Sequence, residues 1–293
     1  MVLSGAQVEQ YHSMGFLTIP DFLPADLLAA AQAALGCHYP TPDEYFADPV
    51  AHERLAKSQF AGLVTFPFGD YALNRLAVAP DLVSIARQLL ETDDIRLTKG
   101  ELWAKYQGAI NYDQDFHRDF GNHTLVVPRT DQRWKELTTY IYLSDVAVGA
   151  GATAIIPREY TDSISFGENR LPQDNPARAH AQYVEGRAGT LVLYSYDVFH
   201  RGVEMTTPGS SRFMVLADFA RRDAPWIDRH AWPHHGLNRN MIEFIERITP
   251  DQRNLMDFPP VGHAYWNAQT LADIQVRYPN MDVSAYADAL AAR

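Results

Sequence analysis

The chain has 293 residues, of which 46% are hydrophobic and 21% charged, as expected for one globular domain with a core large enough to fold without disulfides. The formal net charge of -11 argues against nucleic acid and anionic membranes as main partners, because both require a basic surface. The single cysteine, Cys37, excludes an intramolecular disulfide and any metal site built from several thiolates.

The first residues carry no basic segment followed by an apolar core, so no signal peptide is predicted. No apolar run approaches the roughly 18 residues that a membrane span needs. We therefore expect a cytoplasmic protein that acts on a small-molecule substrate. The sequence gives no signal of oligomeric state.

The first 94 residues are predicted to form a helical N-terminal flank with one short strand. Ser4 can cap a helix that ends at Gly15, and residues 16–20 form an apolar, extended run. Pro24 and Pro80 each stand where a further helix begins, since proline is favoured at a first helical position.

The pattern changes at Ile95, where short apolar runs separated by Gly and Pro replace helical periodicity. Such runs without intervening helices predict an antiparallel sandwich or barrel. The predicted strands are 95–106, 124–127, 137–146, 152–156, 189–194, 198–205 and 212–219.

This β region, 95–219, is interrupted once, by the long polar segment 158–187. A loop of that length is predicted to be a lid over a site, or else disordered. Residues 220–293 again read as helical, and we expect this extension to cover one face of the sheet. The whole chain, 1–293, is predicted to be a single α+β domain that is mainly β.

Candidate metal ligands lie in the stretch Phe116-His117-Arg118-Asp119-Phe120. On extended backbone, His117 and Asp119 point to the same side, so both can bind one ion. A second histidine would complete the 2-His-1-carboxylate triad of non-haem iron oxygenases. With 11 histidines in the chain, one His-x-Asp triplet is expected by accident, so the triplet alone is weak.

We choose His200 as the second histidine because it lies on a predicted strand near the end of the β region. A competing cluster surrounds Pro233, with His230, His234 and His235 beside it. Proline breaks the helical spacing that would bring those imidazoles together, so this cluster is disfavoured.

Arg212 opens the last predicted strand. If it pairs with Glu204 across a hairpin, His200 pairs with Leu216 and all face the barrel interior. Arg212 would then lie ~13 Å along the sheet from the metal ligand, which suits a five-carbon dicarboxylate held at both ends. Gly202, between them on the same face, would leave room for it. The alternative is a plain ion pair between Arg212 and Glu204, and a slip of one residue would remove the shared face.

Together these residues make the chain resemble the phytanoyl-CoA dioxygenase family of Fe(II)- and 2-oxoglutarate-dependent oxygenases. The resemblance is carried by residues 11–23, 116–119, 151–157 and 188–194, which lead to His200. Two departures stand out. Arg158-Glu159-Tyr160 replaces the usual Gly-Ser-His, and Arg212 lies twelve residues after His200 where eleven is usual.

The resemblance implies a double-stranded β-helix, the jelly-roll barrel that cupins share, and a hydroxylase or a desaturase. His117, Asp119 and His200 would be the catalytic metal ligands for Fe(II). 2-Oxoglutarate would chelate the iron and pair with Arg212, beside Tyr140. O2 would take the last position, ascorbate would serve as reductant, and succinate and CO2 would be released. Asp119 argues against a halogenase, in which a small residue replaces this carboxylate.

The sequence says less about the substrate than about the metal site. Five aromatic residues could line a pocket: Trp103, Tyr106, Phe116, Phe120 and Tyr142. The lack of a basic cluster disfavours a CoA thioester and favours a small metabolite, amino-acid derivative or natural-product intermediate. A cupin-like metal-dependent isomerase or hydrolase, needing neither Arg212 nor oxygen, and a non-catalytic metabolite-binding barrel remain alternatives. Arg118 is expected to point away from the metal, so that its replacement does less harm than that of either neighbour.

Overall fold

The computed structural model describes residues 1–109, 113–119, 136–224 and 238–293. Phe120, the predicted strand 124–127 and the histidines around Pro233 therefore lie outside the described residues. The strands are β1 (Phe16–Ile19), β2 (Leu63–Thr65), β3 (Ile95–Tyr106), β4 (Glu136–Tyr142), β5 (Thr153–Ile155), β6 (Gln182–Val184), β7 (Leu191–Ser195), β8 (His200–Arg201) and β9 (Ser211–Arg221).

Helices precede and follow the strands in sequence. The α-helices are α1 (Gly5–Met14), α2 (Ala25–Ala34), α3 (Pro42–Ala47), α4 (Tyr71–Asn74), α5 (Pro80–Leu89), α7 (Arg239–Arg247), α8 (Pro250–Asn254), α9 (Ala268–Arg277) and α10 (Ser284–Ala291). Short 3₁₀ helices are η1 (Leu35–Cys37), η2 (Glu53–Ala56), η3 (Arg75–Val78), η5 (Arg158–Tyr160) and η6 (Pro176–His180). Within the described ranges, no helix is long and apolar enough to cross a membrane.

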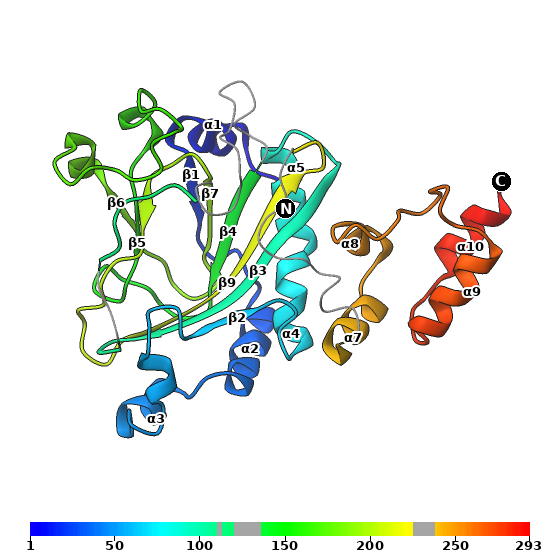
Figure 1. Cartoon of the computed structure of the whole chain (residues 1–293), viewed down its shortest axis with the longest axis horizontal. Helices are drawn as coiled ribbons and strands as arrows, with labels where there is room; N and C mark the ends of the chain where they lie inside the picture. The colour runs from blue at the N-terminus through cyan, green and yellow to red at the C-terminus, as the bar shows by residue number, and fades with distance from the viewer. Residues whose placement is uncertain (110–112, 120–135, 225–237) are drawn as a thin grey trace.

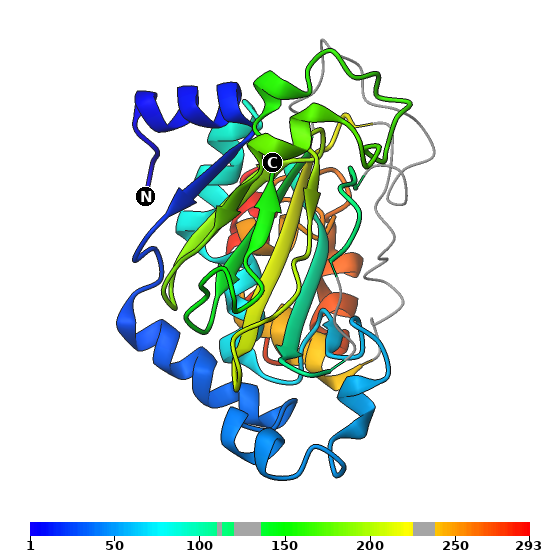
Figure 2. The same ribbon diagram turned by 90° about the vertical axis from the view of Figure 1, so that its left-hand side faces the viewer.

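The strands form two antiparallel sheets, as the sequence predicted (Figure 1). The larger sheet has the order β1-β7-β4-β9-β3-β2 and the smaller one the order β6-β5-β8. Helices α2, α4 and α5 lie on the side of the larger sheet that faces away from the smaller sheet (Figures 1 and 2). This arrangement is the predicted double-stranded β-helix, with its interior between the sheets.

Side chains of β9 alternate between these two environments. Phe213, Val215 and Phe219 join the large apolar cluster under the helices. Arg212, Met214 and Leu216 line the space between the sheets. The period of two along a strand therefore separates an apolar layer from a more polar interior.

A β-bulge in β3 sets which of its residues reach the interior. The register with β9 shifts between Leu97 and Lys99. Leu97 packs in the helical layer, whereas Lys99 and Trp103, an even number of residues further on, line the interior. Without the shift, residues at this spacing would share one face with Leu97.

The predicted hairpin between His200 and Arg212 is wrong. Strand β8 is only two residues long and pairs with β5, where Ile155 lies opposite His200. Strand β9 pairs instead with β3 and β4, where Tyr140 lies opposite Leu216. The two strands belong to different sheets, because a jelly roll passes the chain from one sheet to the other rather than folding it back on itself.

Residues 238–293 contain helices α7 to α10, and only part of this segment packs near the larger sheet. In α7, Phe244 lies with its ring centroid 5.1 Å from that of Phe66 in the helical layer. Helices α9 and α10 lie farther out (Figure 1), where Trp266 and Tyr286 are in ring contact. Buried Arg253 of α8 links α7 to α10, because it donates to the carbonyl of Ile245 at 2.9 Å and to the Tyr286 hydroxyl at 3.5 Å.

Gly15 ends α1 with a positive φ of 81° and packs against the β region. Its carbonyl accepts a hydrogen bond from the Ser195 N–H at 2.9 Å. A Cβ added here would lie 2.1 Å from Val198 Cγ1 and 3.3 Å from Arg158 Cζ. Both the backbone conformation and the close approach therefore require glycine.

We predict that Gly15→Ala lowers the free energy of unfolding by at least about 2 kcal/mol, from left-handed strain plus overpacking. Gly5→Ala is the matched control, because Gly5 lies in the same helix with no atom within 4 Å of an added Cβ. That change should be neutral or stabilise by less than about 1 kcal/mol. Urea unfolding of both variants measures the difference, and equal stabilities would contradict the packing described.

Candidate functional site

His117 and His200 are brought together by a pair of backbone hydrogen bonds. The His117 N–H donates to the His200 carbonyl and the His200 N–H to the His117 carbonyl, each at 3.0 Å. The stretch 113–119 thereby joins β8 as a further strand-like neighbour. Residues directly opposite in such a pair present their side chains to the same face, so the two imidazoles lie side by side.

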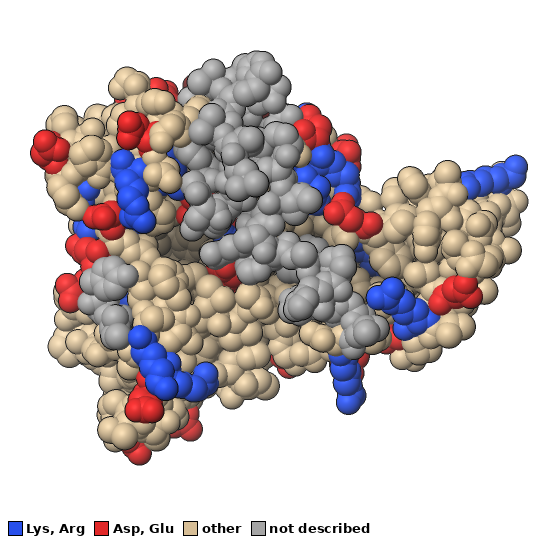
Figure 3. All heavy atoms as spheres, viewed as in Figure 1, with Lys and Arg blue, Asp and Glu red and all other residues tan. Residues whose placement is uncertain are grey.

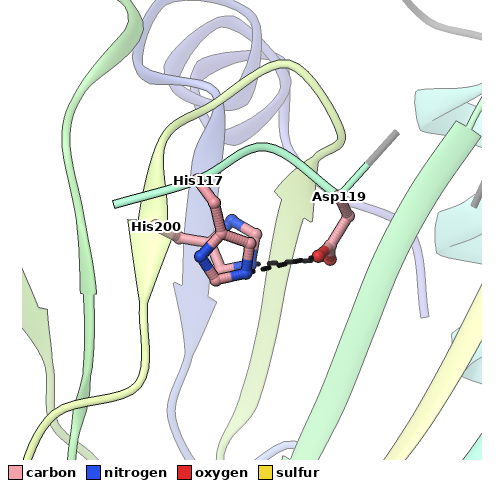
Figure 4. A group of neighbouring side chains, drawn as sticks. All are labelled: His117, Asp119 and His200. Atoms are coloured by element: carbon pink, nitrogen blue, oxygen red, sulfur yellow. Dashed lines mark ion pairs between the residues drawn. The ribbon is translucent and has the colours of Figure 1, made fainter. Parts of the chain in front are cut away.

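Asp119 turns its carboxylate toward both imidazoles (Figure 4). Its Oδ1 lies 3.6 Å from His117 Nε2, and its Oδ2 lies 3.5 Å from His200 Nε2. One potential ligand atom from each residue falls within 4.8 Å of the others. Among the described residues, this is the one such group of three, and two nitrogens with one carboxylate oxygen suit a first-row metal with open positions.

The remaining ring nitrogens fix how the imidazoles face. Nδ1 of His117 lies 2.8 Å from the Asp115 carbonyl, and Nδ1 of His200 lies 3.4 Å from that of Val198. A proton on each Nδ1 leaves the Nε2 lone pair free toward Asp119. Burial lowers the pKa of His200 to about 4, with Asp119 opposing the shift in part. His200 is therefore neutral near pH 7, as a metal ligand must be.

Tyr194 of β7 adds a contact that sequence reasoning missed. Its hydroxyl donates to Asp119 Oδ2 at 3.4 Å, and its ring centroid is 4.6 Å from that of His200. Burial raises its pKa well above the ordinary value, with the Asp119 charge acting in the same direction. The phenol therefore stays protonated and can hold the carboxylate in place. Its position at the end of an apolar run was the available signal.

The triad opens into a cavity of about 180 Å³ between the two sheets. Four further residues predicted for the site line it: Trp103, Tyr140, Gly202 and Arg212. Residues that were not predicted also line it, among them Phe60, Lys99, Glu101, Gln114 and Thr153. Phe60 precedes β2 and Gln114 precedes the triad, and both reach the cavity only through the way distant segments pack together. No local sequence pattern therefore predicts either residue as part of the site.

Arg212 lies in this cavity, although by a different route from the one predicted. Its buried guanidinium donates to the Gly151 carbonyl. The alternative ion pair with Glu204 does not form, since Glu204 is exposed and its N–H donates to Asp113. Burial lowers the Arg212 pKa, with Tyr142 and Tyr140 opposing the shift.

Tyr140 lies near Arg212 with its hydroxyl buried and without a well-aligned hydrogen-bond partner in the described part of the chain. Burial raises its pKa, and nearby Thr153 only partly offsets this. A guanidinium and a phenol that line the same cavity as the His117–Asp119–His200 triad fit an anionic chelator. Gly202 lines the cavity, but a Cβ there would first meet Gln114 at 3.1 Å.

The expected aromatic pocket is only partly present, since three of its members do not line the cavity. Tyr106 is three residues from Trp103, so it faces the opposite side of β3, where it stacks on Tyr45 at 4.0 Å. Phe116, adjacent to His117, faces the other way beneath the guanidinium of Arg201. Tyr142 donates to the Val184 carbonyl at 2.7 Å.

The predicted lid, 158–187, is not structureless. It contains η5, η6 and β6, and part of it pairs with the triad stretch. The Arg118 N–H donates to the Asn169 carbonyl at 3.0 Å, and the Leu171 N–H donates to the Phe116 carbonyl at 2.9 Å. Closure of this segment over a substrate stays a prediction.

Figure 3 shows acidic and basic side chains interspersed on the visible face. Among the described residues of that face, the basic side chains do not form a continuous patch.

Residues 11–214 match the family model described as phytanoyl-CoA dioxygenase (PhyH). No curated protein matches the chain in sequence. Among solved structures, the epimerase SnoN, in complex with Fe3+, alpha ketoglutarate and nogalamycin RO, is 18% identical with a TM-score of 0.54, covering 76% of this chain and 85% of that one.

Two further structures share this fold. HygX from Streptomyces hygroscopicus, with nickel, 2-oxoglutarate and hygromycin B bound, is 14% identical with a TM-score of 0.55, covering 78% of this chain and 98% of that one. The apoform of EctD from S. alaskensis is 19% identical with a TM-score of 0.58, covering 78% of this chain and 84% of that one. At these identities, the likeness shows the double-stranded β-helix.

Lys105, opposite Arg212 in the sheet, gives a test of this polar end of the barrel. Burial, with Arg212 adding to it, lowers its pKa to about 8. The unfolded chain binds this proton more tightly, so stability rises with pH between about 8 and 10. From pH 7 to 9, wild type should gain up to about 1 kcal/mol over Lys105→Met in urea unfolding, after allowing for solvent screening. The control Lys57→Met, at an exposed position, should show no such pH trend. A stability difference between wild type and Lys105→Met that does not change with pH would reject the lowered pKa of Lys105.

Proposed function

The chain belongs to the phytanoyl-CoA dioxygenase family of Fe(II)- and 2-oxoglutarate-dependent oxygenases, and from this premise we propose that it hydroxylates a small metabolite or natural-product intermediate. The observation that carries the proposal is one cavity containing His117, Asp119 and His200 together with buried Arg212. A plain structural metal site would need no cationic anchor in the same cavity.

The residues present fit the family's metal and cosubstrate. Fe(II) would be held by Nε2 of His117 and His200 and by the Asp119 carboxylate, which Tyr194 steadies. The distal carboxylate of 2-oxoglutarate would be bound by the Arg212 guanidinium, with the Tyr140 hydroxyl as a second donor. When bound with O2, iron and 2-oxoglutarate supply the oxidising chemistry, with release of succinate and CO2.

The protein's own contribution is orientation and an enclosed site. Nδ1 contacts with backbone carbonyls hold both imidazoles in the tautomer that binds metal. Met214 and Leu216 form an apolar wall of the cavity between its polar groups. Excluding water there strengthens the Arg212 interaction with a carboxylate.

A small substrate suits the cavity mouth. Phe60 is half exposed and packs edge-to-face on Trp103, with ring centroids 5.5 Å apart. Such a pair offers a face for a flat or apolar group, and the Trp103 N–H is fixed by Glu101 at 2.9 Å. SnoN and HygX were solved with nogalamycin RO and hygromycin B, which supports a natural-product substrate over a CoA thioester.

We expect His117→Ala to abolish succinate formation from 2-oxoglutarate in the presence of Fe(II), O2 and ascorbate. The two ligands that remain, Asp119 and His200, would not be enough to hold the iron. His263→Ala is the control, since that histidine is exposed in the C-terminal segment. Unchanged turnover in His117→Ala would reject the assignment. Turnover of a substrate without oxygen would favour a cupin-like isomerase or hydrolase, and failure to bind Fe(II) or 2-oxoglutarate would favour a non-catalytic barrel.

Arg212→Gln should raise the KM for 2-oxoglutarate on the order of 10- to 100-fold, because a charge-assisted pair is lost. Metal affinity should be unchanged, since Arg212 does not touch the triad. Arg221→Gln, in the same strand but paired with Asp223 at the surface, is the control. The KM is measured by steady-state kinetics at varied concentrations of 2-oxoglutarate. A KM within twofold of wild type contradicts this role for Arg212.

A further inference from the structure

Two buried arginines converge on Asp197, three residues before the ligand His200. Arg158 binds the Asp197 carboxylate with two donors, Nε at 3.1 Å and Nη2 at 2.8 Å. Arg118 Nε donates to the backbone carbonyl of the same residue at 2.8 Å. All three side chains are almost fully buried. We call Arg118, Arg158 and Asp197 the arginine–aspartate cluster.

Arg118 stands between two metal ligands, and alternation along the extended stretch turns it away from the cavity. Its guanidinium lies 4.1 Å from the ring centroid of Phe199, the residue before His200. The same group donates to the Ser165 carbonyl at 3.0 Å. Longer contacts of 3.4 Å reach the carbonyls of Thr161, Ile164 and Glu168.

Arg158 connects the cluster to the start of the chain. Its guanidinium donates to the carbonyl of His12 in the last turn of α1. It also lies against Gly15, where an added Cβ would be 3.3 Å away. The cluster therefore joins four pieces distant in sequence: the end of α1, the triad stretch, the segment 158–168 and the turn that leads into β8.

We propose that Arg118, Arg158 and Asp197 are positioning residues that hold the triad in register, a role that rests on the proposed metal site. None of them touches the cavity, so their effect passes through the backbone of the ligands. A planar guanidinium with several fixed donors binds carbonyls from different segments at once, which defines their relative position. Loss of outer partners of metal ligands typically weakens metal binding 10- to 100-fold.

Replacing Arg118 is still expected to do less harm than replacing His117 or Asp119. Its side chain points away from the triad, as the spacing predicted. Its guanidinium nevertheless binds carbonyls on both sides of the triad stretch, so its loss should loosen His117 and Asp119 together. An ammonium at this position would keep the charge but not the fork.

The test is calorimetric titration of the full chain with Co(II). We expect Arg118→Met and Asp197→Asn to raise the Kd for Co(II) about 10- to 100-fold. Arg118→Lys should restore thermal stability in part but not metal affinity, which a merely structural role would not predict. The control is Arg87→Met, which removes a two-donor pair with Asp251 between α5 and α8, far from the triad in sequence.

Circular dichroism first establishes which variants are folded. Folded Arg118→Met and Asp197→Asn proteins that bind Co(II) within threefold of wild type would overturn the positioning role. Should Asp197→Asn fail to fold, the double variant Arg158→Met/Asp197→Leu replaces the buried pair with apolar side chains and tests that pair. Should Arg118→Met fail to fold, Arg118→Lys takes its place. Weak Co(II) binding in the folded substitute supports the proposal and wild-type binding overturns it. Failure of wild type itself to bind Co(II) would instead reject the proposed metal site.

Discussion

The reciprocal hydrogen bonds between the backbones of His117 and His200 are the constraint on which the site depends. They place two imidazoles from distant parts of the chain on one face, and Asp119 then follows from the alternation of a single extended stretch. The same stretch pairs on its other edge with residues 169–171. The three candidate metal ligands thus belong to a small ladder whose strands come from three separate segments.

The barrel interior accommodates the charge of Lys99 because a buried carboxylate is paired with it. Lys99 and Asp218 lie 2.6 Å apart and both are almost fully buried, and the Tyr196 hydroxyl donates to the same carboxylate at 2.9 Å. Removing one member would leave an uncompensated buried charge, which is strongly destabilising. On the opposite face of the same strands, the side chains are apolar and pack under helices. The bulge in β3 decides which residues belong to which face.

Part of the fold and of the candidate site could be predicted from local sequence patterns. The His-x-Asp spacing, the strand-borne His200 and the antiparallel class follow from periods of two and from turn residues. Alternation alone also separates Trp103 from Tyr106, although both were expected in the pocket. Arg212 was correctly predicted to face the interior, but from a hairpin that does not form. Which strands pair depends on the path of the whole chain, and a local pattern does not encode that path. Phe60, Tyr194 and the partners of Arg118 depend on such non-local contacts, which no local pattern encodes.

The residues proposed to bind the metal and the cosubstrate stand on different sheets. The triad is built on the smaller sheet and its neighbouring stretch, whereas Arg212 and Tyr140 stand on the larger sheet, which the helices support. In the proposed site, the span between the triad and the guanidinium would therefore depend on the distance between the sheets as well as on the side chains themselves. The spacing of the two sheets would then limit the length of the dicarboxylate that fits. A substitution in the helical layer that shifted the larger sheet would change this length without touching the triad.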